Sequence, residues 1–104
     1  MMDGTTRTAL INAWVLWQQN AEITQLDHAL GGSNDCPLCQ VFFSTSCKGC
    51  PIAEDTGQMH CHGSPYDDAK AAFRAVRDER ASIDLFRQNA QRFADYLRSL
   101  NTPE

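Results

Sequence analysis

Two stretches of the chain place apolar residues at helical spacing, and a third stretch lies between them. Within residues 5–30, Leu10, Trp14 and Trp17 follow one another at intervals of four and three residues, which is the spacing of one helical face. A glycine pair at 31–32 favours the end of this helix, because glycine adopts the left-handed C-terminal conformation at little cost. The pattern predicts a first helix over 5–30, and a bend near Gln19–Asn20 stays open.

The apolar pattern returns in residues 64–100. Ser64 followed by Pro65 is typical of a helix start, and the apolar positions after it repeat every three or four residues. A single helix over this range would be about 54 Å long, which exceeds the usual diameter of a small domain. The run Arg77–Arg80 is fully charged and the apolar stripe slips in phase there. We therefore expect a break near 78–82, with Ser82 capping a second helix. One continuous helix stays the alternative.

Residues 33–63 differ from both helical regions in composition. They contain all five cysteines of the chain, together with prolines and glycines that favour turns, and the only helix expected here is a short one at 39–43. The cysteines form two CxxC pairs and one single position: Cys36, Cys39, Cys47, Cys50 and Cys61. A CxxC pair can bend around one ion, because the intervening backbone N–H groups point at the sulfurs and stabilise their thiolate charge. The spacing therefore predicts a metal site.

Four of the five cysteines are enough for a tetrahedral site. The two CxxC pairs are the first choice, and the alternative set replaces Cys47 with Cys61. His60 or His62 could instead complete a site of three cysteines and one histidine. Zinc suits four thiolates and needs no redox chemistry. An iron–sulfur cluster is the alternative cofactor, because Cys50 precedes a proline as in bacterial ferredoxin motifs, although the tight triple-cysteine run of those motifs is absent.

These patterns together predict one all-α domain over residues 1–104, a small helical bundle with a zinc-pinned, loop-rich central segment. Structural zinc contributes about 10–16 kcal/mol in small peptides, which matches the roughly 5–15 kcal/mol stability of a whole domain. We therefore expect loss of the metal to unfold at least the central segment. The expected core residues are Trp14, Trp17, Phe73, Val76, Phe86, Phe93 and Leu97. The residues expected to seal the metal segment onto the bundle are Phe42, Phe43 and Ile52.

Charge and motif content narrow the range of functions. The formal net charge is −4, and four thiolates with one zinc ion would make it more negative, so the balance disfavours nucleic-acid binding. Seven of the nine basic residues lie in 64–100, but six acids accompany them, and we expect Asp84 to pair with Arg80 or Arg87. No apolar run approaches the roughly 20 residues of a membrane span, and no secretory signal is recognisable, which predicts a cytoplasmic protein. No catalytic motif is present, so we expect a protein partner and no enzymatic activity.

The run CPLC, followed by CKGCPIAEDTGQMHCHGSPY, resembles a group of small uncharacterised proteins encoded by bacteriophages and prophages. That group carries CxLC, CxGCP and Cys-x-Gly-(Ser/Thr)-Pro-Tyr in this order. The resemblance implies that Cys61 belongs to the metal pattern with the other four cysteines. It also implies an accessory protein in the host cytoplasm that modulates the host, such as an antagonist of a defence system. Whether the chain is a monomer or a homodimer stays open.

Overall fold

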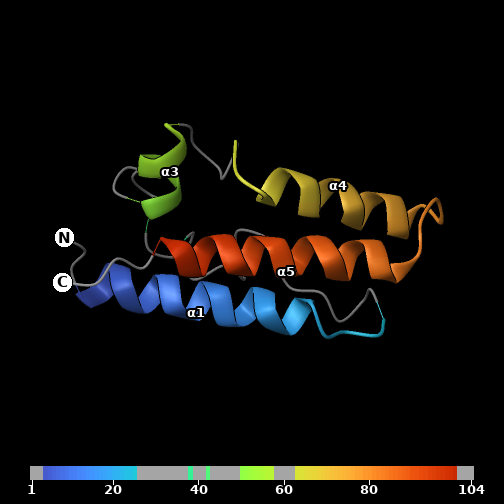
Figure 1. The fold of residues 1–104 in the computed structure, drawn as a ribbon, viewed down its shortest axis with the longest axis horizontal. Coiled ribbons are helices and arrows are strands. Elements are labelled where there is room, and N and C mark those ends of the chain that lie inside the picture. The colour runs from blue at the N-terminus through green and yellow to red at the C-terminus, as the bar shows by residue number, and fades with distance from the viewer. Residues whose placement is uncertain (1–3, 26–37, 39–41, 43–49, 58–62, 101–104) are drawn as a thin grey trace.

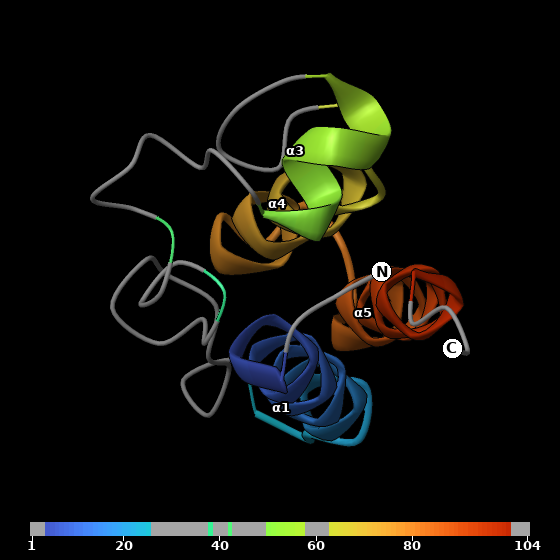
Figure 2. The same ribbon diagram turned by 90° about the vertical axis from the view of Figure 1, so that its left-hand side faces the viewer.

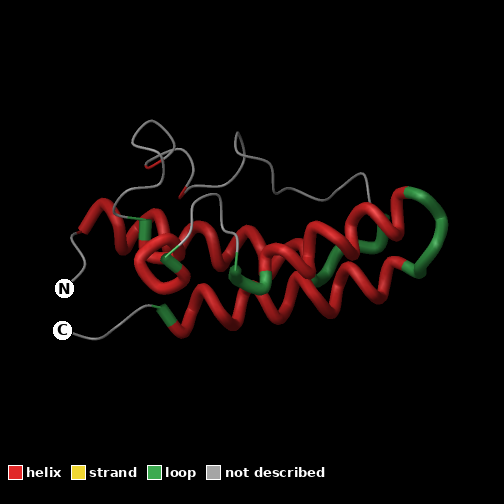
Figure 3. The backbone as a smooth tube through the Cα atoms, turned by 90° about the horizontal axis from the view of Figure 1, so that it is seen from above, coloured by secondary structure: helices red, strands yellow, loops and turns green. Residues whose placement is uncertain are grey.

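The predicted all-α class is confirmed by a computed structural model, which describes residues 4–25, 38, 42, 50–57 and 63–100. Four helices follow one another in this part of the chain: α1 (Gly4–Asn20), α3 (Pro51–Thr56), α4 (Tyr66–Arg77) and α5 (Ile83–Ser99). None of the described residues is in a strand, as Figure 3 also shows.

Helix α5 is the centre of the arrangement. It packs against α1 and α4, and both run antiparallel to it (Figure 1). The short helix α3 lies beside the C-terminal end of α5, on the side that α4 occupies further along (Figures 1 and 2). Helix α4 has only 12 residues against 17 in α5. On this side of α5, α4 packs along most of the helix and α3 lies beside its C-terminal end.

The first helix is shorter than predicted. Helix α1 ends at Asn20, where the sequence leaves a bend open, and residues 21–25 are not helical. The expectation of a helix over 5–30 is therefore wrong in this part. The physical reason comes from α5: Arg87 Nε donates a hydrogen bond to the carbonyl oxygen of Ala21 at 3.1 Å. In a continuing helix that carbonyl would accept the N–H of residue 25, and the guanidinium takes the place of that bond. Residues 26–30 lie outside the described part of the chain.

The predicted break in the C-terminal region is confirmed. Helix α4 ends at Arg77 and α5 begins at Ile83. Ser82 occupies the N-cap position with an extended backbone (φ −78°, ψ 160°). At the start of α4, the N-cap position is occupied by Pro65, one residue after the predicted Ser64. The Ser64 hydroxyl accepts a hydrogen bond from the backbone N–H of Tyr66 at 3.2 Å.

The turn after α4 has the hydrogen bonds of a Schellman motif. Glu79 N–H donates to the carbonyl of Val76 at 3.1 Å, and Arg80 N–H donates to the carbonyl of Ala75 at 2.8 Å. Glu79 itself has a positive φ of 60°, a position where glycine is preferred. The charged run thus ends α4 through backbone bonds, at the cost of one strained glutamate.

The core is built around the indole ring of Trp17. Its ring centroid lies 5.0 Å from Phe93 and 5.8 Å from Tyr66, both in edge-to-face geometry. Such aromatic pairs contribute about 0.5–1.5 kcal/mol beyond area burial. Four of the seven predicted core residues are buried: Trp17, Phe86, Phe93 and Leu97. The other three are partly buried and pack against this core: Trp14, Phe73 and Val76.

Helix α3 was not predicted, because six residues are too few to show a helical period. Its end signals are nevertheless present in the sequence. Pro51 stands at the first helical position, and Gly57 follows the last residue with a left-handed φ of 73°. Leu38 and Phe42 are both helical, in agreement with a short helix in this region, and the other positions of 39–43 lie outside the described residues.

Candidate functional site

One of the five predicted metal ligands, Cys50, lies in the described part of the chain. Its companions are outside it: Cys36, Cys39, Cys47 and Cys61, with His60 and His62. Among the residues that the structure describes, no group of three or more His, Cys, Asp or Glu is placed to hold a metal ion. The ligand set therefore stays a prediction from the spacing of the cysteines.

Cys50 is held at the start of α3. It is 5% exposed and has an extended backbone conformation (φ −64°, ψ 131°). Pro51 then fixes the first helical φ, and the carbonyl of Cys50 accepts the Glu54 N–H at 3.0 Å. The helix thus sets the backbone at this cysteine.

The first CxxC pair is also connected to the core. Leu38 stands between Cys36 and Cys39 in the sequence, and it is 1% exposed. It belongs to the same cluster of buried residues as Cys50 and Ile52, and Phe42 packs against that cluster. Each CxxC pair therefore has a member or an intervening residue in the common core. Of the three predicted sealing residues, Ile52 is fully buried, Phe42 is partly buried, and Phe43 lies outside the described residues.

The chain after Cys61 returns to the core at Gly63–Tyr66. Gly63 N–H donates to Asp67 Oδ2 at 2.9 Å, and Ser64 is 7% exposed. The Tyr66 ring lies 5.5 Å from Phe93, between centroids, in addition to its contact with Trp17. The Gly-Ser-Pro-Tyr end of the cysteine motif is thus anchored by the helix start and by the aromatic core.

Helices α4 and α5 carry most of the described charged residues, and many of these form ion pairs there or in the turn between them. Arg77 Nε lies 3.1 Å from Asp78 Oδ1, and Arg80 lies 3.6 Å from Asp78 Oδ2. Arg87 pairs with Asp84 at 3.7 Å, which is one of the two pairings predicted for that acid. The pKa of Asp78 is lowered, first by the hydrogen bond from Arg77 and then by the positive charges of Arg77 and Arg80. The basic residues after Lys70 therefore do not form a bare cationic stripe.

The outer face of α1, formed by Thr8, Asn12, Val15 and Gln19, differs from the faces of α4 and α5. All four residues are exposed, and Val15 is 43% exposed. The only charged residue in the 17 residues of α1 is Arg7, whereas α4 and α5 have five charged residues each. This uncharged surface was not recognised from the sequence, because the apolar positions run almost all the way round the helix and hide which face is outside.

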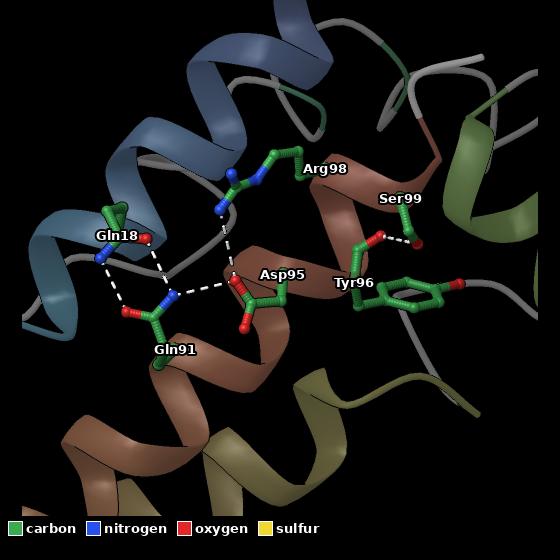
Figure 4. Close-up of polar contacts among 6 residues, drawn as sticks. All are labelled: Gln18, Gln91, Asp95, Tyr96, Arg98 and Ser99. Carbon is green, nitrogen blue, oxygen red and sulfur yellow. Dashed lines mark hydrogen bonds and ion pairs between the residues drawn. The ribbon is translucent and has the colours of Figure 1, made fainter.

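A polar bridge joins α1 to α5 (Figure 4). Gln18 Nε2 donates to Gln91 Oε1 at 2.7 Å, and Gln91 Nε2 donates back to Gln18 Oε1 at 2.9 Å. Gln91 Nε2 also reaches Asp95 Oδ1 at 3.0 Å, and Asp95 pairs with Arg98 at 3.5 Å. The reciprocal amide pair fixes the register of the two helices. The sequence pattern does not indicate this pair.

Comparison with protein-family models, with curated proteins and with solved structures gives no match. Among the described residues, no helix has both the length and the apolar character needed to cross a membrane.

Proposed function

We propose that the protein is a non-enzymatic protein-interaction module whose central segment is ordered by one zinc ion. The proposal includes an accessory role in a phage or prophage, as an antagonist of a host system, which rests on the resemblance of the CPLC and CKGCP runs. Zinc would be held by four of the five cysteines, with an iron–sulfur cluster as the alternative. When bound, zinc supplies a fixed tetrahedral centre and no redox chemistry.

The zinc part of the proposal is supported by where the cysteine segment meets the core. Leu38 lies inside the first CxxC pair, Cys50 closes the second, and Tyr66 ends the motif after Cys61. Leu38 and Cys50 belong to one buried cluster, and Tyr66 packs against it. Two CxxC pairs can bind the same ion only if they lie close together. The contacts of Leu38 and Cys50 with one buried cluster favour that arrangement. The residues available have the chemistry that zinc requires, because thiolates are its preferred ligands.

The outer face of α1 is the observation that carries the interaction role. It extends along a helix about 25 Å long and carries no charge on its four exposed positions. The cores of protein interfaces are depleted in charged residues, because burying an unpaired charge on association is costly. The exposed valine at its centre supplies apolar area to a partner. We therefore assign the partner's docking surface to this face.

A pair of matched substitutions tests the assignment. Val15→Glu introduces a charge at the centre of the outer face of α1, and Leu85→Glu does so at a site of similar exposure (40%, against 43%) on α5. We expect the wild-type chain, immobilised in a bacterial host lysate, to retain a partner that the first variant loses and the second retains. Light scattering on the purified chains tests a second copy as that partner.

Two results would contradict the proposal. One is a wild-type chain that is monomeric and retains no protein above background. The other is equal retention by both variants. Tight, salt-sensitive binding of DNA or RNA in a gel shift would favour the nucleic-acid alternative instead.

A further inference from the structure

A hydrogen bond connects the helix that follows Cys50 to the end of the bundle. Tyr96 Oη donates to Asp55 Oδ2 at 2.6 Å, across 41 residues of sequence. This distance is typical of a charge-assisted bond between a hydroxyl and a carboxylate, which is stronger than a bond between neutral groups. Asp55 is on α3 and Tyr96 is on α5, so the bond spans the two helices.

Tyr96 is a well-supported donor. Its ring stacks on Phe93 with an interplanar angle of 15° and a centroid distance of 6.2 Å. Phe93 is 1% exposed and makes the closest ring contact of Trp17 among those described. The position of the Tyr96 hydroxyl is therefore set by the aromatic core, and the bond transfers that order to α3.

Helix α3 transmits the position of Asp55 to Cys50. The two residues are five positions apart, which is about 7.5 Å along a helix. The carbonyl of Cys50 accepts the Glu54 N–H, and Ile52 between them is fully buried. Two contacts hold α3 on the bundle: the buried side chain of Ile52 and the Asp55–Tyr96 hydrogen bond. Together they restrict the rotation of α3 relative to the bundle. The backbone at Cys50 is thereby fixed.

We propose that Tyr96 and Asp55 are positioning residues for the metal centre, acting through α3 on Cys50; this rests on the proposed zinc site. Zinc binding requires Cys50 in place, so the measured affinity scales with the fraction of molecules in which α3 is docked. The hydrogen bond stabilises only the docked state. A solvent-accessible hydrogen bond contributes about 0.5–1.5 kcal/mol. Because we expect α3 to be mainly undocked in the zinc-free chain, loss of the bond weakens zinc binding about 2- to 12-fold.

The experiment measures zinc affinity by competition with a chromophoric chelator. Tyr96→Phe removes the donor and keeps the ring, and Asp55→Ala removes the acceptor. Glu54→Ala is the matched control, because it removes a neighbouring carboxylate of α3 and so reports the loss of negative charge alone. Arg87→Ala weakens the bundle at the other end of α5 and controls for a general loss of stability. Circular dichroism checks that each variant keeps its helical content.

We expect Tyr96→Phe and Asp55→Ala to weaken zinc binding by the same factor, and the double variant to lose no more than either single variant. The two controls should keep wild-type affinity. If the wild-type chain binds zinc and Tyr96→Phe binds it equally well, the positioning role is wrong and the zinc site stands. Additive losses in the double variant would also overturn the positioning role. A wild-type chain that binds no zinc would overturn the metal centre itself, and the positioning role with it.

Discussion

The side chain of Ile52 offers the sharpest test of whether the cysteine segment is part of the bundle's core. Ile52 is fully buried and belongs to the cluster that α1 and α5 form. Replacing a buried isoleucine by alanine costs about 2–5 kcal/mol, from lost apolar burial and the cavity left behind. That is a large share of the roughly 5–15 kcal/mol that stabilises a domain, and it corresponds to a fall in Tm of roughly 10–20 °C for a chain of this length.

Urea unfolding followed by tryptophan fluorescence measures this loss at a distance from the mutation. Both tryptophans are on α1, and Trp17 lies in the aromatic core against α5, whereas Ile52 is on α3. If α3 unfolds together with the bundle, Ile52→Ala lowers the urea midpoint seen by these tryptophans. Val15→Ala is the control, because Val15 is exposed and its truncation should change stability by less than about 0.5 kcal/mol.

The reasoning fails if Ile52→Ala and the wild-type chain have the same fluorescence midpoint. That result would mean that α3 opens independently of the bundle, and that the core seen by the tryptophans does not include the cysteine segment. An earlier transition by circular dichroism than by fluorescence would lead to the same conclusion.

Three further outcomes follow from the helix contacts and turns. Gln18→Leu or Gln91→Leu alone should cost about 1–2 kcal/mol by leaving a part-buried amide without its partner, and the double variant should recover most of it in a urea double-mutant cycle. Glu79→Gly should raise the free energy of unfolding by about 1 kcal/mol, measured as a higher urea midpoint, because φ is 60° at this residue. In a carboxyl NMR titration, the pKa of Asp78 should lie below the ordinary value of 3.8, and Arg77→Ala should raise that pKa again. Because the folded-state pKa is lowered, the stability linked to Asp78 is present above pH 3.8 and is lost as the pH falls through the folded-state value.

The sequence predicts the long helices of the C-terminal region well. Their apolar stripes have one clear face, and the charged run Arg77–Arg80 marks a break that the structure confirms. A break is expected because a continuous helix would be too long for a small domain, and the charged run with the phase slip of the stripe gives its place. The turn itself, with a left-handed Glu79, has no signature in residue type.

The end of α1 and the existence of α3 depend on contacts that are distant in sequence. Arg87 bonds to the carbonyl of Ala21 from 66 residues away, and Tyr96 reaches Asp55 across 41 residues. A reading of local patterns extends the first helix too far, because the apolar spacing continues beyond the possible bend near Gln19–Asn20. The same reading misses α3, because its place depends on contacts with the C-terminal end of α5, such as the bond between Asp55 and Tyr96.

The candidate site is the part that the sequence defines most sharply and the structure describes least. The spacing of two CxxC pairs has a direct chemical meaning, because thiolates at those intervals can surround one ion. Contacts in the structure add what spacing cannot give: the burial of Cys50, and the placing of Leu38 in the same cluster. The metal and the set of four ligands stay predictions.

The central claim is that thiolate coordination to one zinc ion orders the cysteine segment. Elemental analysis of the chain, purified without added metal, tests this claim most directly. The account predicts about one zinc per chain, and it predicts that a strong chelator removes the metal together with the helical signal of the central segment. A folded chain that contains no metal, or one that contains iron in place of zinc, would contradict it.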